Sequence, residues 1–166
     1  MRKRSNIKLP ALLLALMFVL LPGCAETGTA EISEDVYAAA GDGQIVDIRD
    51  RYTADGELHG SDAGAPVQTL LLDNAEDNER VSSEALFEIS EDANTRLGIT
   101  ASWRQSGETL YVGVASAEGT IYALGLTSGA AHGTVDLSGL PAGEYAVTMF
   151  SSNDADVFAS LSYQIA

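Results

Sequence analysis

The sequence predicts an all-β protein that contains a single small antiparallel β-sandwich, and three observations support this fold class. From about residue 66 onward, apolar residues alternate with polar or small residues in short runs, which is the period of a strand with one face inward. Turns rich in Gly, Pro, Ser and Asn separate these runs. No helical run of comparable clarity lies between them, and many short strands without helices are typical of a sandwich.

Length and composition are consistent with one domain and exclude one class of partner. The chain has 166 residues, of which 46% are hydrophobic, and this suits one core rather than two. A single cysteine cannot close an intramolecular disulfide, so stability has to come from apolar packing. The net charge of -15 repels phosphate backbones, so we expect no nucleic-acid partner.

The N-terminus has the pattern of an export signal. Four basic residues lie within the first eight, residues 11–21 form an unbroken apolar run, and Pro22-Gly23-Cys24 follows. The run is too short to cross a membrane as a helix, which takes about 20 apolar residues. We therefore predict that residues 1–23 are a signal peptide and that the mature chain begins at Cys24.

Leu21-Pro22-Gly23-Cys24 resembles the lipobox of bacterial lipoproteins. The leucine three places before the cysteine and the glycine one place before it match that pattern, whereas Pro22 departs from the usual Ala, Ser or Thr. The resemblance implies cleavage before Cys24, a diacylglycerol on its thiol, and anchoring on the extracytoplasmic face of the cell membrane or outer membrane. Two acyl chains suffice for stable anchoring. The alternative is an ordinary secretory signal with an incidental cysteine.

Residues 24–65 are predicted to form an acidic, flexible tether. The mature chain has five arginines, no lysine and 24 acids, a net charge of -19. Low hydrophobicity with like charges predicts an extended, mobile segment that keeps the domain away from an anionic membrane. The β-branched residues of 45–52 leave a second interpretation open, a strand that docks on the domain.

Residues 66–166 form the predicted sandwich domain. In the run from Leu97 to Trp103, the shared phase of the apolar residues predicts that Trp103 lies in the core and that Arg104 faces outward. The alternative places Trp103 in a ligand platform with Tyr111 or Tyr122 on a neighbouring strand. The predicted strands are residues 67–72, 86–89, 97–103, 110–114, 121–126, 134–137, 144–149 and 157–165.

The stretch from Leu137 to Val147 is similar to the strand-turn-strand junction of Greek-key sandwiches, which include immunoglobulin-, fibronectin-III-, prepeptidase- and carbohydrate-binding-like modules. Pro141 fixes φ, Gly143 permits a left-handed turn, and the hydroxyl of Tyr145 can bond back to upstream backbone. Such junctions occur in proteins of many functions, so this one indicates the fold and not the activity.

No strong catalytic motif is present in the chain. The histidines are His59, in the expected tether, and His132, in a glycine-rich stretch. A serine triad of Ser128, His132 and Asp136 can be drawn, but four-residue steps along a loop or strand do not aim three side chains at one point. We therefore predict no catalytic residue.

Two acidic segments carry oxygen ligands of the kind that calcium prefers, residues 73–79 and 153–156. The first lacks the alternate-residue spacing and the glycine of an EF-hand loop, and the second has the same weakness. Both are interpreted as solvated acidic loops, with calcium binding as the alternative. The sequence therefore predicts neither a metal site nor a cofactor.

Together these features predict a non-enzymatic, membrane-anchored extracytoplasmic lipoprotein that presents a β-sandwich for contact with an envelope protein or glycan. One alternative is a small cell-envelope hydrolase that uses carboxylates. Another is a purely structural envelope component.

Overall fold

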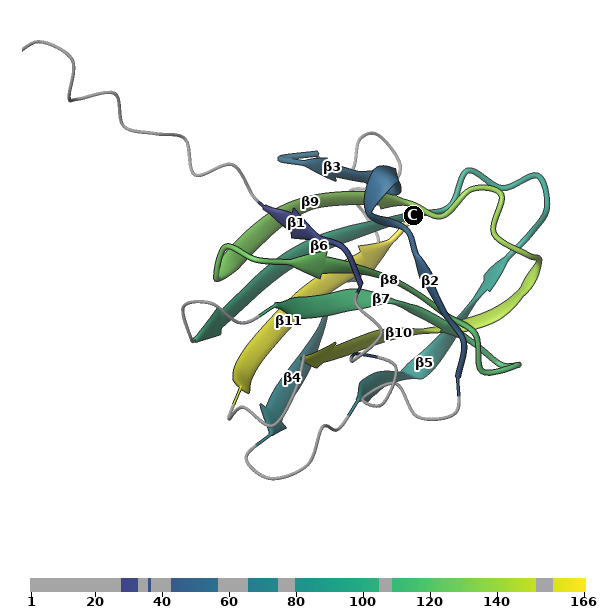
Figure 1. The fold of residues 1–166 in the computed structure, drawn as a ribbon. Coiled ribbons are helices and arrows are strands. Elements are labelled where there is room, and N and C mark those ends of the chain that lie inside the picture. The colour runs from purple at the N-terminus through teal and green to yellow at the C-terminus, as the bar shows by residue number, and fades with distance from the viewer. Residues whose placement is uncertain are drawn as a thin grey trace, which may run out of the picture.

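In the computed structural model, the chain forms two β-sheets packed face to face (Figure 1), which confirms the all-β sandwich. Within the residues that it describes there is no α-helix, and a short 3-10 turn, η2 (Arg49–Arg51), precedes β3. The described residues are 28–32, 36, 43–56, 66–74, 80–104, 109–151 and 157–166.

One sheet, here called sheet A, has the strand order β1-β8-β7-β10-β5, with β2 beside β8. The other, sheet B, has the order β3-β9-β6-β11-β4. Neighbouring strands are antiparallel throughout, except that β2 runs parallel to β8. The strands are β1 (Thr29–Ala30), β2 (Ile45–Asp47), β3 (Tyr52–Ala54), β4 (Gln68–Asn74), β5 (Val81–Ile89), β6 (Arg96–Arg104), β7 (Leu110–Ser116), β8 (Ile121–Leu126), β9 (Ala130–Asp136), β10 (Gly143–Ser151) and β11 (Val157–Ile165).

The strands from β4 to β11 pair as a nested hairpin. The first pairs with the last, β4 with β11, and the inner pairs are β5 with β10, β6 with β9 and β7 with β8. Every connection except that from β7 to β8 crosses between the sheets. This is the strand order of a jelly roll, a sandwich of two Greek keys. It differs from the immunoglobulin order because nearly every consecutive strand changes sheet.

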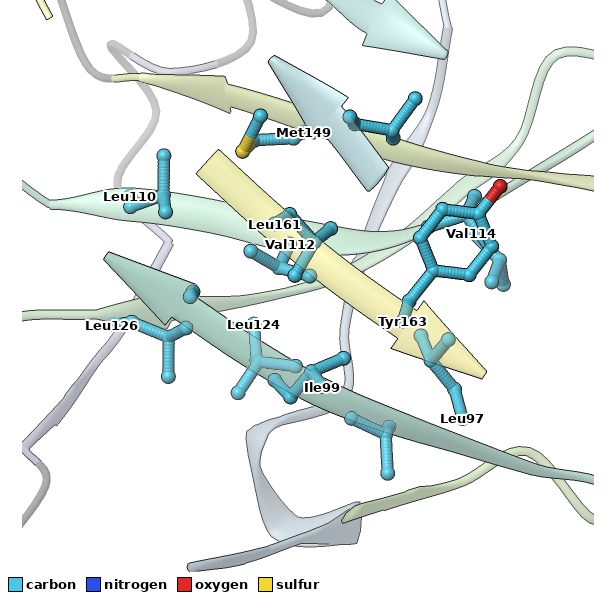
Figure 2. Close-up of a cluster of buried hydrophobic side chains, with 14 of the residues drawn as sticks. Leu97, Ile99, Leu110, Val112, Val114, Leu124, Leu126, Met149, Leu161 and Tyr163 are labelled. Atoms are coloured by element: carbon cyan, nitrogen blue, oxygen red, sulfur yellow. The ribbon is translucent and has the colours of Figure 1, made fainter. Parts of the chain in front are cut away.

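The main core lies between the two sheets. Figure 2 shows side chains of β6 and β11, including Leu97 and Leu161, facing those of β7, β8 and β10. In β6, buried and exposed residues alternate along the strand, as the period-two pattern predicts. Trp103 is 6% exposed and belongs to this core, and Arg104 faces outward, so both predictions are confirmed.

A second apolar cluster covers the outer face of sheet A. Val36 and Ile45, which precede the expected domain, pack with Tyr111, Ile121 and Phe150. The rings of Tyr111 and Phe150 stack with centroids 5.1 Å apart. Consecutive residues of β7 and β10 are therefore buried, because these strands have apolar neighbours on both faces.

The sandwich extends further toward the N-terminus than predicted. Within the expected tether, β2 pairs with β8, β3 pairs with β9, and the Ile48 backbone N–H donates to the Ala123 carbonyl at 2.9 Å. The docked strand within residues 45–52 is thus what the structure contains, and a start at residue 66 is too late. The physical reason is that Ile45 and Ile48 gain burial on a sheet that already exists, whereas an isolated hairpin is marginal.

Two strands of the domain begin earlier than the apolar pattern suggests. β5 starts at Val81 rather than residue 86, and β9 starts at Ala130 rather than residue 134. Apart from Val81, the residues that extend these strands are small or polar, so hydrophobic alternation does not reveal them. Backbone pairing with β10 and β6 extends these strands regardless of side-chain polarity.

The junction between β9 and β10 contains the predicted tyrosine corner. Tyr145 is buried, and its hydroxyl donates to the Pro141 carbonyl at 2.7 Å. Gly143 has a positive φ of 156°, a backbone conformation that favours glycine, in line with the prediction for this position. Gly139, with φ of 75°, is a second such position and lies closer to the left-handed helical region.

Candidate functional site

The structure does not bring Ser128, His132 and Asp136 together as a catalytic triad. Ser128 donates its hydroxyl to the Ala130 carbonyl, and Asp136 accepts the backbone N–H of Ser138 at 2.9 Å. His132 lies on β9 four residues from Asp136, a separation of about 13 Å along a strand. These three side chains therefore do not form a nucleophilic site.

The alternative aromatic platform is also absent from its expected place. Trp103 belongs to sheet B and faces the core, whereas Tyr111 and Tyr122 belong to β7 and β8 of sheet A. Burial raises the pKa of Tyr111, whose ring stacks on Phe150 within the second apolar cluster. Tyr122 lies beside Tyr145, with ring centroids 6.2 Å apart.

Several predicted positions lie outside the described residues: Cys24, His59 and the acidic segments 75–79 and 153–156. Asp73, at the start of the first acidic segment, is exposed on β4. Among the residues that the structure does describe, no group of three or more His, Cys, Asp or Glu could hold a metal ion.

The feature that best resembles a site is the outer face of sheet B. Here residues from adjacent strands stand in register and form two rows that cross β4, β11, β6 and β9. One row is Thr69, Ser162, Thr100 and His132, and the other is Leu71, Ser160, Ser102 and Ala130.

Hydrogen bonds within the rows hold several of these side chains in place. Thr100 Oγ1 and His132 Nδ1 are 2.8 Å apart. The hydroxyl oxygens of Ser102 and Ser160 are 3.2 Å apart. Because a hydroxyl can both donate and accept, each retains capacity for a further partner on the solvent side.

A shallow hollow lies at one end of this face and is lined in part by Gly98. It has a volume of about 340 Å³. Thr100, His132, Ser162 and Gln164 supply polar groups around it. Val67, 63% exposed, adds an apolar wall. We call it the Gly98 hollow.

A second hollow lies at the other end of the same face, where β6 and β4 end and β11 begins. Its volume is about 600 Å³. Leu71 and Phe158 line it with apolar surface, and Asp73 and Arg104 flank Phe158 in register. We call it the Phe158 hollow.

Neither row contains a carboxylate, although the chain has 24 acids. The rows offer uncharged hydroxyl groups and an imidazole, and the Gly98 hollow adds the Gln164 amide. The charged Asp73 and Arg104 lie beyond the rows, beside Phe158. A neutral polar ligand could exchange hydrogen bonds with these groups without stripping water from a carboxylate.

Sequence reasoning did not identify this face. Its residues are the polar partners in the alternating runs of β6, β9 and β11, and such residues ordinarily face solvent. The available signal was that Ser and Thr predominate at these positions in place of charged residues. The register that aligns them in rows requires the structure.

Comparisons of the chain with family models, with curated protein sequences and with solved structures found no match. In the described part of the chain, no helix has the length and apolar character needed to span a membrane.

Proposed function

We propose that this protein is an extracytoplasmic lipoprotein, anchored through Cys24, whose sandwich is a non-enzymatic binding module. The outer face of sheet B binds an uncharged, hydroxyl-rich ligand, a glycan of the cell envelope. The lipobox resemblance supports the anchor, and the chemistry of the face supports the ligand class.

The observation that carries the ligand class is the pair of carboxylate-free rows in a chain of net charge -15. On a strongly acidic surface, the carboxylates are tightly hydrated, and a ligand that covers them must displace this water. Rows that lack carboxylates cost less to desolvate against a neutral polysaccharide.

Apolar side chains on the same face complement the hydroxyl groups. Val67, Leu71 and Phe158 are all at least half exposed, at 63%, 67% and 50%. Apolar surface beside a few placed polar groups is the usual composition of a small-molecule or cofactor site. The C–H faces of sugar rings would pack on Val67, beside the Gly98 hollow, while hydroxyl groups bond to the rows.

The test is co-sedimentation of the mature protein with insoluble polysaccharides, including peptidoglycan sacculi. Ser102→Glu places a carboxylate in the middle of a row and should abolish pelleting. Ser90→Glu adds the same charge at an exposed position outside the face and is the matched control. Thermal unfolding of both variants separates lost binding from lost folding.

Two results would contradict the glycan proposal. Pelleting that Ser102→Glu leaves unchanged would place any binding elsewhere, and the absence of pelleting with all polysaccharides would favour a structural or protein-binding role. Release of soluble fragments during the incubation would favour the hydrolase. The anchor is tested separately, by fatty-acid labelling of the wild type and of Cys24→Ser.

A further inference from the structure

The first described residue after Cys24 lies at one identifiable end of the sandwich. The Gly28 carbonyl accepts the backbone N–H of Thr127 at 3.0 Å. Two residues after Thr127, the Gly129 carbonyl accepts the backbone N–H of Trp103 at 2.9 Å. Gly28 is thus located where β8 and β6 end and β9 begins. In Figure 1, β1 and these strand ends lie on the left of the molecule, away from the loop between β9 and β10.

The Phe158 hollow lies at this same end. Phe158 is opposite Arg104 on β6 and Asp73 on β4. Sheet strands are about 4.8 Å apart, so Phe158, on the second strand from β9, is roughly 10 Å from the β8–β9 turn across the sheet.

The length of chain before Gly28 limits how far this end can be from the anchor. Three residues lie between Cys24 and Gly28, and a fully extended chain covers at most about 14 Å over these four Cα–Cα steps. If Cys24 is lipidated, as in the proposed function on which this inference rests, the end that carries Gly28 stays close to the bilayer.

We propose that Leu71, Arg104 and Phe158 form a membrane-contact surface that rests on the bilayer in which Cys24 is anchored. Leu71 and Phe158 lose exposed apolar area at the lipid interface, and the Arg104 guanidinium donates hydrogen bonds to lipid phosphates. The surface is small, but the anchor holds it at a high effective concentration near the lipid.

Net charge does not drive this contact. The sequences that join the strands at this end, residues 75–79, 105–108 and 152–156, contain six carboxylates. These acids are repelled by anionic lipids, so the contact should be stronger on zwitterionic than on anionic bilayers.

The orientation has a consequence for the open face of sheet B. With the Phe158 end on the bilayer, the strands run outward, and the Gly98 hollow lies farther from the lipid. Gly98 and Arg104 are six residues apart on β6, or about 20 Å along the strand. The outer face of sheet B would then be roughly perpendicular to the membrane surface, and the Gly98 hollow would be accessible to a glycan.

The experiment uses the lone thiol of the mature chain. The protein is joined through Cys24 to a maleimide-bearing lipid in phosphatidylcholine vesicles that contain brominated acyl chains. Phe158→Trp and Val67→Trp report from opposite ends of sheet B, both on exposed residues and both over the same Trp103 background. We expect blue-shifted, strongly quenched emission from Phe158→Trp and no change on anchoring for Val67→Trp.

Equal quenching of the two variants, stronger quenching of Val67→Trp, or no quenching of either would overturn the proposed surface. Stronger quenching on anionic vesicles would overturn the stated lipid preference. Chemical conjugation supplies the anchor here, so this outcome is independent of natural lipidation. Conversely, failed fatty-acid labelling in cells would refute the proposed anchor and leave the conjugation result standing.

Discussion

The two outer faces of the sandwich differ in what covers them. On sheet A, Tyr111, Ile121 and Phe150 are buried beneath Val36 and Ile45. On sheet B, the corresponding face carries in-register hydroxyl side chains that no further layer of described residues covers. The difference indicates that the N-terminal segment stabilises one face and leaves the other available for binding.

The strand sequences reflect this difference. β7 begins Leu-Tyr-Val-Gly-Val, and all five residues are buried. β6 alternates buried and exposed residues along nearly its whole length. A strand that is apolar on both faces requires a cover on each side, whereas an alternating strand requires only one. In this chain, Ile32, Val36 and Ile45 contribute to that second cover.

The largest expected effect contrasts two phenylalanines, one on each outer face. Phe150→Ala should lower the free energy of unfolding by about 3–5 kcal/mol, because it opens a cavity in the second apolar cluster. Phe158→Ala should change it by no more than about 0.5 kcal/mol, because the ring is half exposed. Chemical denaturation of both variants measures the difference. Equal losses would show that the outer faces are not differently covered.

The next prediction tests the cover itself. Ile45→Ala should cost about 2 kcal/mol, the low end for a buried isoleucine, because β2 is an edge strand that can partly relax. If residues 45–47 were instead part of a mobile tether, Ile45→Ala would leave the free energy of unfolding unchanged. Amide hydrogen exchange provides a second measurement, and protection at Ile48, whose N–H bonds to Ala123, should fall in the variant.

A third comparison uses one tyrosine from each sheet. Tyr145→Phe removes the hydrogen bond to the Pro141 carbonyl and should cost about 1 kcal/mol. Tyr163→Phe, in sheet B, removes a bond to Gln68 Oε1 and should cost less, because a side-chain amide can turn to water. The measurement is the denaturation midpoint. A larger loss for Tyr163→Phe would reverse this ranking of the two hydroxyl groups.

The smallest expected effect concerns pH at the edge of sheet B. Hydrogen bonds from Ser138, with smaller contributions from Arg51 and Arg96, hold the pKa of Asp136 below its usual value of 3.8. Its stabilising effect is therefore fully present above about pH 4 and declines as the pH falls through the lowered pKa. Unfolding of wild type and Asp136→Asn should differ at neutral pH and converge in acid. A gap that persists at low pH would assign the effect to something other than ionisation.

The sequence alone predicted the all-β class, the inward phase of Trp103 and the bond of Tyr145 back to upstream backbone. These features follow from local periodicity and from turn residues close together in the chain. The leader, Cys24 and the acidic segments 75–79 and 153–156 remain predictions, since they lie outside the described residues.

Only the tertiary structure decided the jelly-roll order, the docking of residues 45–54 and the alignment of the hydroxyl rows. Each depends on contacts between residues far apart in the chain, such as Thr100 with His132 and Ile45 with Ile121. A three-residue strand such as β2 is unstable by itself, so local propensity does not reveal it. It forms because sheet A already presents an apolar outer face and an unpaired edge at β8, and burial there compensates for the entropy lost on ordering.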